Sequence, residues 1–119
     1  MRDFKTLKVW ERSHQLTLPV YQASGGFPRE EIYGLTSQMR RASASIAANI
    51  AEGCGRGSEA DFARFLQMAA GSASELEYHA ILVRDLKFLD GPIYENINQE
   101  VTQIKRTLTA FIKTLKADG

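Results

Sequence analysis

The sequence predicts an all-α protein, an antiparallel up-down-up-down four-helix bundle that forms a single domain over residues 1–119. Two observations predict this fold. Four segments repeat their apolar side chains at the three- and four-residue spacing of an amphipathic helix. Short connections containing Gly or Pro separate these segments, and helices joined in this way pack as antiparallel neighbours. No stretch alternates apolar and polar residues as a half-buried strand does.

The first helix is predicted from about Leu7 to Ser24. Pro19 removes an intrahelical hydrogen bond and crowds the carbonyl of Gln15, which predicts a kink. Gly25-Gly26 is expected to end the helix by supplying a positive φ. The expected core stripe and the three aliphatic residues that widen it are Leu7, Trp10, His14, Leu18 and Tyr21, with Val9, Leu16 and Val20.

The second helix is predicted from about Leu35 to Glu52, after a helical first turn at residues 27–31 and a break at Gly34. It carries an apolar stripe and a polar stripe side by side, and its many small side chains let neighbours approach closely. This composition predicts a position inside an assembly. The apolar stripe is Leu35, Met39, Ala42, Ile46, Ile50 and Gly53. The polar stripe is Gln38, Arg41, Ser45, Asn49 and Glu52.

The third helix is predicted to begin after Ser58, whose hydroxyl can cap the amide of Asp61, and to run for about 30 residues. Its expected core residues are Phe62, Phe65, Leu66, Ala69, Ala73, Leu76, Ala80, Val83 and Leu86. Asp90-Gly91-Pro92 forces a turn before the fourth helix. The fourth apolar stripe is the most regular of the chain and comprises Ile93, Ile97, Val101, Ile104, Leu108, Phe111 and Leu115.

Composition narrows the functional classes. The net charge of +1 does not mark the chain as a dedicated nucleic-acid binder. The single cysteine, Cys54, excludes an intrachain disulfide and a multi-cysteine zinc site. The first ten residues lack the apolar stretch of a signal peptide, and no run approaches 18 apolar residues. We therefore expect a soluble cytoplasmic protein without a membrane partner.

A polar network is predicted between the second and third helices, because a helical hairpin sets their polar stripes opposite each other. Arg41 and Glu75 are placed to form a charge-assisted pair. The network is interpreted as structural, fixing helix register and subunit orientation; the alternative is a carboxylate-bearing pocket. Its residues are Gln38, Arg41, Ser45, Asn49, Glu52, Ser72 and Glu75.

Residues 53–58, Gly-Cys-Gly-Arg-Gly-Ser, superficially resemble a phosphate-binding loop but lack the Lys-Ser or Lys-Thr that such a loop requires. They are interpreted as a helix stop and a turn, with a weak anion site at Arg56 as the alternative. Cys54 is expected to be an exposed but passive thiol. His14 and His79 are expected at the core edge or an interface. No catalytic residue, metal ligand, cofactor or small-molecule substrate is assigned.

Charge is distributed unevenly between the two ends of the predicted bundle. The end formed by residues 1–15, 45–73 and 105–119 holds ten Lys and Arg against six Asp and Glu, whereas the opposite end holds five against eight. In a ring of parallel subunits, the first end would form a basic rim able to hold RNA phosphates. The alternative is a solvated surface whose charges cancel locally. The candidate nucleic-acid-binding residues are Lys5, Lys8, Arg12, Arg56, Arg64, Lys113 and Lys116.

Specific residue runs match a known family. These runs are Phe4…Leu7…Val9-Trp10, Phe27-Pro28…Glu31…Gly34-Leu35, Arg41-Ala42…Ser45-Ile46…Asn49-Ile50-Ala51-Glu52-Gly53 and Phe62…Phe65-Leu66…Ala69…Gly71-Ser72…Glu75-Leu76. The chain resembles the four-helix-bundle proteins named for 23S-rRNA intervening sequences. The resemblance implies a ring-like homopentamer. It extends to the accessory variability determinant of diversity-generating retroelements, which binds RNA and a reverse transcriptase through a basic surface.

Three functional hypotheses follow. The leading one is a non-enzymatic oligomeric bundle, a pentamer by resemblance, that binds or scaffolds RNA or a nucleic-acid enzyme. The second is a purely protein-binding or structural oligomer without a nucleic-acid role. The third is an enzyme with a site near Arg41 and Glu75, which the absence of a nucleophile–base pair or metal set at recognisable spacing disfavours.

Overall fold

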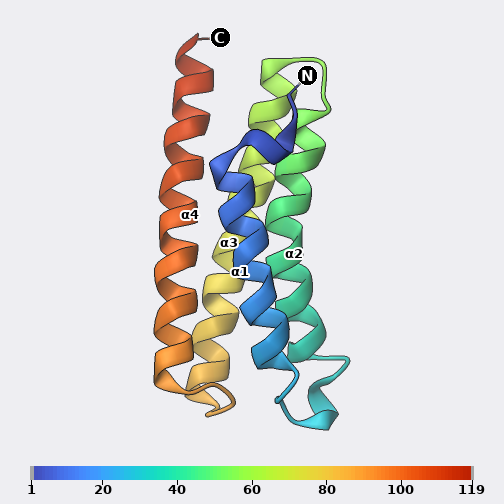
Figure 1. The fold of residues 1–119 in the computed structure, drawn as a ribbon, viewed down its shortest axis with the longest axis vertical. Helices are drawn as coiled ribbons and strands as arrows, with labels where there is room; N and C mark the ends of the chain where they lie inside the picture. Colours follow the sequence, from blue (N-terminus) through green and yellow to red (C-terminus); the bar gives the residue numbers. More distant parts are fainter. Residues whose placement is uncertain (1, 119) are drawn as a thin grey trace.

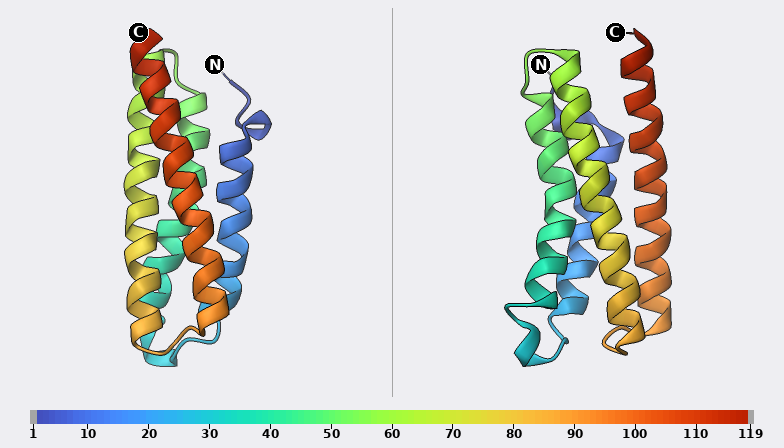
Figure 2. Two further views of the ribbon diagram at one scale, coloured as in Figure 1. Left: turned by 90° about the vertical axis from the view of Figure 1, so that its left-hand side faces the viewer. Right: turned by 180° about the vertical axis from the view of Figure 1, so that it is seen from behind.

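The computed structural model describes residues 2–118, which form four α-helices and two short 3-10 helices and contain no strand. The elements are η1 (Phe4–Thr6), α1 (Lys8–Ser24), η2 (Arg29–Glu31), α2 (Leu35–Cys54), α3 (Glu59–Asp85) and α4 (Gly91–Asp118). Each helix runs antiparallel to the next, and α1 closes the bundle against α4 (Figures 1 and 2). The predicted all-α up-down-up-down bundle is confirmed, and it measures 46 × 22 × 20 Å.

The core is built by one apolar stripe from each helix, as the sequence predicts for α2, α3 and most of α4. Complete burial of such side chains contributes about 1.5–3 kcal/mol each. An edge-to-face contact between Phe62 and Phe111, with centroids 5.4 Å apart, joins α3 to α4. The largest side chains without exposed surface include Met39, Ile46, Ile50, Leu66, Leu76, Ile97, Ile104 and Leu108.

The buried face of α1 differs from the predicted one. Leu18 and Tyr21 are 52 and 43 % exposed, and the buried residues are Val9, Ser13, Leu16, Val20 and Ser24. Two serines therefore occupy core positions. Each donates its hydroxyl proton within α1, Ser13 to the carbonyl of Val9 at 2.7 Å and Ser24 to that of Tyr21 at 3.2 Å. Because these hydroxyls are satisfied locally, their small side chains can be buried where α1 meets α2.

Two helix ends also differ from the predictions. None of the described glycines has a positive φ, and α1 ends at Gly25 with φ −63°. The left-handed residue is Lys87 instead, with φ 66°. The amides of Lys87 and Phe88 bond to the carbonyls of Arg84 and Val83, both at 2.9 Å, which is a Schellman closure of α3. This early stop leaves Leu86, a predicted core residue, 46 % exposed.

The remaining sequence features that predicted helix starts and a kink concern Ser58, Pro28 and Pro19. Ser58 caps α3, because its Oγ accepts a hydrogen bond from the Asp61 amide at 3.1 Å. The segment before α2 forms the short helix η2 after Pro28. Pro19 lies inside α1 without interrupting it. At the start of α4, Ile93 is 38 % exposed and extends the predicted apolar stripe beyond the core.

Gly53, in the last turn of α2, lies close against α3. A Cβ placed on Gly53 would lie 2.8 Å from the Phe65 Cβ and 3.1 Å from the Phe62 Cδ1. Both obstacles are aromatic residues of the core-facing side of α3. Gly53 therefore sets the separation of the two helices at this end.

We expect Gly53→Ala to destabilise the fold by about 1–3 kcal/mol, because α3 must shift to admit the added carbon. Gly57→Ala is the matched control, since a Cβ at this exposed position in the α2–α3 turn meets nothing within 4 Å and the residue has no positive φ. The control should stabilise the protein by about 0.4–1 kcal/mol by restricting the unfolded chain. Urea denaturation measures both effects, and equal midpoints for the two variants would contradict the prediction.

Candidate functional site

The predicted polar network divides into separate parts. Its connected part is a group of three side chains centred on Ser45. The Ser45 Oγ accepts hydrogen bonds from Ser72 Oγ and Asn49 Nδ2, each at 3.0 Å, and Asn49 also donates to the Ser45 carbonyl at 2.9 Å. Glu52 does not join this group, because its carboxylate binds Arg56 at 3.2 Å. One hydroxyl pair therefore connects α2 to α3 within the network.

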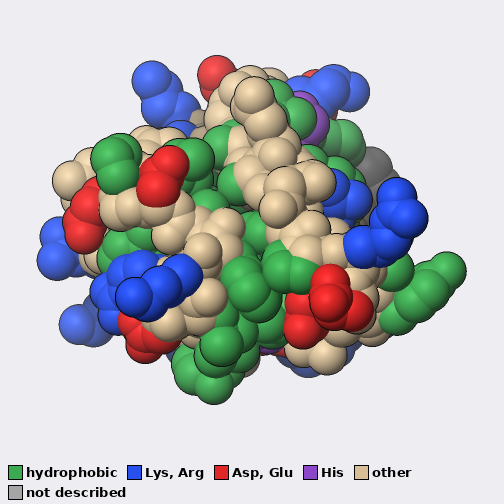
Figure 3. All heavy atoms as spheres, turned by 90° about the horizontal axis from the view of Figure 1, so that it is seen from below, with side chains coloured by type: hydrophobic (Ala, Val, Ile, Leu, Met, Phe, Trp, Pro, Cys, Tyr) green, Lys and Arg blue, Asp and Glu red, His purple; other side chains and the backbone are tan. Residues whose placement is uncertain are grey.

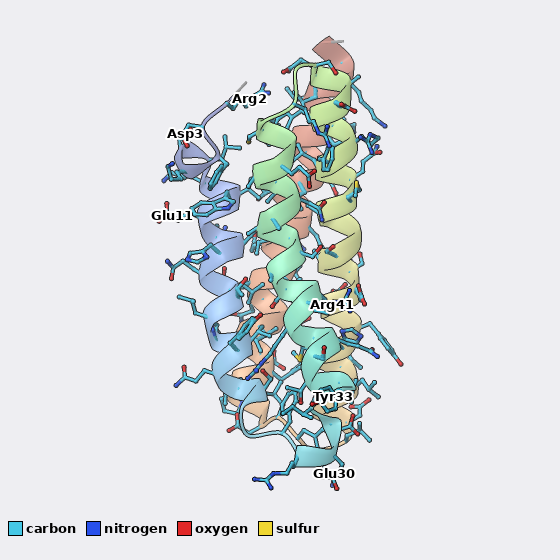
Figure 4. The ribbon with its side chains drawn as sticks, turned by 90° about the vertical axis from the view of Figure 1, so that its right-hand side faces the viewer. Arg2, Asp3, Glu11, Glu30, Tyr33 and Arg41 are labelled. Carbon is cyan, nitrogen blue, oxygen red and sulfur yellow. The ribbon has the colours of Figure 1, made fainter. Side chains whose placement is uncertain are left out.

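Arg41 and Glu75 do not form the predicted ion pair, because no contact within 4.0 Å joins them. They line an open cleft of about 280 Å³ with Gln38, Ala42 and Ser45. Arg41 lies on the outer face of α2, above the exposed Tyr33 (Figure 4). The cleft is therefore an open groove between α2 and α3.

The two histidines occupy different environments. His79 is buried on α3, with Nε2 4.0 Å from the Glu75 Oε2, and its Nδ1 has no hydrogen-bond partner among the described residues. His14 is exposed on α1, and its ring stacks on Trp10 with centroids 5.3 Å apart. His79 therefore lies in the core and His14 on the surface, where a position at a subunit interface stays a prediction.

Cys54 is buried, with 2 % of its surface exposed, so the expectation of an exposed thiol is wrong. The N-terminal segment ahead of α1 accounts for this. The Arg2 amide donates to the Cys54 carbonyl at 3.0 Å, and the Arg2 guanidinium binds Glu59 at 2.8 and 3.1 Å and lies over the Phe62 ring. Burial raises the pKa of the Cys54 thiol, and the nearby Arg2 charge opposes this shift. We call residues 2–7 the N-terminal strap.

The N-terminal strap also changes the pKa of Glu59, the carboxylate that Arg2 binds. The hydrogen bonds from Arg2 hold the pKa of Glu59 below its usual value. Glu59 is thereby kept ionised at the start of α3, where a negative charge complements the helix dipole.

Four of the seven candidate RNA-binding cations are paired with carboxylates. Lys5 lies 3.7 Å from Asp3 and Arg12 lies 3.2 Å from Glu100. Arg56 pairs with Glu52 and Arg64 with Asp61, each at 3.2 Å, and both guanidinium groups also lie over the Phe65 ring. Arg56 is therefore not free for the anion site considered at the α2–α3 turn.

The other three candidates form no ion pair with any described carboxylate: Lys8, Lys113 and Lys116. The chain ends and the α2–α3 turn do lie at one end of the bundle, as the topology requires (Figure 1). The opposite end shows charges of both signs with apolar side chains between them (Figure 3). It is therefore not the uniformly acidic surface that the charge count suggests.

Within residues 2–118, no three His, Cys, Asp or Glu side chains are grouped so that they would hold a metal ion. Over the same residues, none of the helices is both long enough and apolar enough to cross a membrane.

Fold and site together define an all-α four-helix bundle with an open polar cleft between α2 and α3 and a basic end. The chain belongs to the family of 23S rRNA-intervening sequence proteins, which it matches over residues 5–110. It is also similar to a crystal structure of a protein of unknown function from the S23 ribosomal protein family of Bacteroides thetaiotaomicron VPI-5482. The two share 29 % identity with a TM-score of 0.80, over 88 % of this chain and 98 % of the other. No match was found among curated proteins.

We expect the strap to control access to Cys54. Removing the Arg2 guanidinium by Arg2→Ala should raise the rate of reaction with an aromatic disulfide reagent several-fold, because the ion pair and the cation–π contact that hold the strap are lost. In the unmodified protein, the rate should rise only at a pH above that of a free cysteine, since the thiolate reacts and burial raises its pKa.

Lys5→Ala is the control, because Lys5 lies in the same strap but pairs only with Asp3. Its reaction rate should match that of the unmodified protein. An unchanged rate in Arg2→Ala would show that the strap does not protect the thiol.

Proposed function

We propose that this protein is a non-enzymatic homo-oligomer that binds RNA through the basic end of its bundle. The observation that carries the proposal is the uneven charge of the two ends. The chain termini and the α2–α3 turn meet at the end that holds ten Lys and Arg against six Asp and Glu. Phosphate backbones are bound mainly through such surfaces. Several subunits side by side would multiply the local charge.

The outer face of α2 and α3 supports the oligomer. Met68 and Tyr78, at 45 and 58 % exposure, lie on the same side of α3, with Gly71 and Glu75 between them at helical spacing. Met and Tyr are enriched at protein interfaces, and exposed apolar groups beside a concave surface mark interaction sites. This face adjoins the cleft lined by Arg41 and Ser45. We assign it to contact with a second copy, with a pentamer as the expected assembly.

The same cleft supports a non-enzymatic role. Its only hydroxyl nucleophile, Ser45, has an oxygen that accepts bonds from Asn49 and Ser72, and neither group can act as a general base. The buried imidazole of His79 lies with its Nε2 4.0 Å from the Glu75 Oε2. It makes no hydrogen bond with Ser45. The cleft therefore suits the binding of a partner surface better than chemistry.

RNA binding should be electrostatic and reversible by salt. Light scattering with total cellular RNA should show an oligomer whose mass increases at about 50 mM salt and returns to that of the protein alone at about 300 mM, because released counterions drive the association. An oligomer whose mass is the same with and without RNA at low salt would reject the RNA-binding role. It would leave a protein-binding or structural oligomer as the function.

Bulky side chains on the α2–α3 face should impair assembly. Ser45→Leu and Asn49→Leu each place a large apolar group on a crowded polar stripe, where it cannot be accommodated without repacking. Sedimentation velocity should show smaller species for both variants, with helix content retained by circular dichroism. Asn96→Leu, the same substitution as Asn49→Leu at an exposed position of α4, should leave the oligomer intact. Unchanged sedimentation of both variants would refute the assigned interface.

A further inference from the structure

The second half of α4 carries a ridge made only of hydrogen-bond donors and cations. Residues 101–117 contain Lys105, Arg106, Lys113 and Lys116 and no Asp or Glu. Spacings of four, three, four and three place one row along a single side of α4, and all of it except the half-buried Thr102 is exposed. This row, which we call the α4 ridge, is Thr102, Arg106, Thr109, Lys113 and Lys116.

A groove runs beside the ridge. The structure has a hollow of about 510 Å³ lined by Thr102, Arg106, Thr109 and Lys113 of the ridge and by Glu77 of α3. It is larger than the cleft at Arg41. The hollow is open to solvent, and its lining combines apolar side-chain atoms with the cations and hydroxyls of the ridge, which suits a ligand that is both bulky and anionic.

The three described carboxylates that share a hollow with the ridge are each bound to a cation outside it. Glu100, which lies beside Thr102, binds Arg12 at 3.2 Å. Glu77 binds Lys105 at 2.8 Å, with both side chains about one-third exposed. Glu59, which shares a smaller hollow with Lys116, binds Arg2 of the N-terminal strap. Arg106, Lys113 and Lys116 therefore keep their charges unpaired among the described side chains.

The length and chemistry of the ridge fit the backbone of a nucleic-acid helix. At 1.5 Å per residue, Arg106 and Lys116 are separated by about 15 Å along α4, so the ridge is long enough to contact more than one phosphate of a duplex strand. Threonine hydroxyls bind phosphate and sugar oxygens. The hollow contains no aromatic side chain, whereas proteins that hold single strands stack the bases on aromatic rings.

Resting on the proposed function, we infer that the α4 ridge binds the phosphodiester backbone of double-helical RNA without reading the base sequence. Arg106, Lys113 and Lys116 are the phosphate-binding cations, and Thr102 and Thr109 bind backbone and sugar oxygens. Lys105 is a positioning residue that keeps Glu77 from pairing with the ridge. The four paired candidates at this end, including Arg56 and Arg64, are not part of the site.

Fluorescence anisotropy with a 20-base-pair RNA duplex tests the site. The variant carrying Arg106→Gln, Lys113→Gln and Lys116→Gln should bind about tenfold or more weakly at 100 mM salt. Its slope of log affinity against log salt should fall by about 0.9 for each cation removed. The matched control carries Lys5→Gln, Arg12→Gln and Arg64→Gln, which remove the same charge from paired cations at the same end. It should retain affinity within about threefold.

Other results of this experiment would overturn the ridge assignment, the inferred mode of recognition or the proposed function. If the control loses as much affinity as the ridge variant while the unmodified protein binds RNA, the ridge is not the site, although the proposed function stands. If an unpaired RNA strand of equal length binds more tightly than the duplex, or two unrelated duplex sequences differ by more than about tenfold, the inferred mode of recognition is wrong. If the unmodified protein binds no RNA at low salt, the proposed function fails and the ridge assignment fails with it.

Discussion

The close approach of α2 and α3 is the constraint on which the rest of the structure depends. It requires small residues on both helices, with Gly53 against Phe65 at one end and the Ser45–Ser72 hydroxyl pair nearer the middle. Alanines at positions 42, 69 and 73 are buried along the same hairpin. Because interiors are packed at crystal-like density, this spacing fixes the shape of the outer cleft at Arg41 as well as the core. It also sets where the α2–α3 turn meets the N-terminal strap.

Ion pairing, more than net charge, decides which cations of this protein are available to a partner. Arg2 and Arg56 each bind a carboxylate and also lie over an aromatic ring, at distances of 4.3 and 4.6 Å from its centroid. These two arginines stabilise the local structure at the end of the bundle that contains the α2–α3 turn. The cations of α4 beyond Lys105 have no such role. The cations at this end are thereby divided into those paired with carboxylates and those unpaired among the described residues, most of which lie on α4.

The sequence was sufficient to predict the four helices because their apolar periods are long and the connections are short. For α1 the sequence was misleading about which face is buried. The hydroxyls of two buried serines bond to carbonyls of the same helix, so these polar residues did not mark the exposed face. Ser45 and Ser72 were both assigned to the predicted network, but their direct contact was not predicted, and the Arg41–Glu75 pair did not form. Cys54 is joined by a backbone hydrogen bond to Arg2, 52 positions away in the chain, and local patterning contains no signal for such a contact.

The topology of the bundle, in which helices adjacent in sequence pack against each other, also determines how the chain folds. Helices α2 and α3 pack only against helices adjacent in sequence, and the one distant pairing joins α1 to α4. Such a topology has a low contact order, and helical bundles of this kind fold in microseconds to milliseconds. Docking of α1 on α4 is the step with the greatest loop-closure cost. It is therefore expected to complete folding, after the α2–α3 and α3–α4 hairpins have formed.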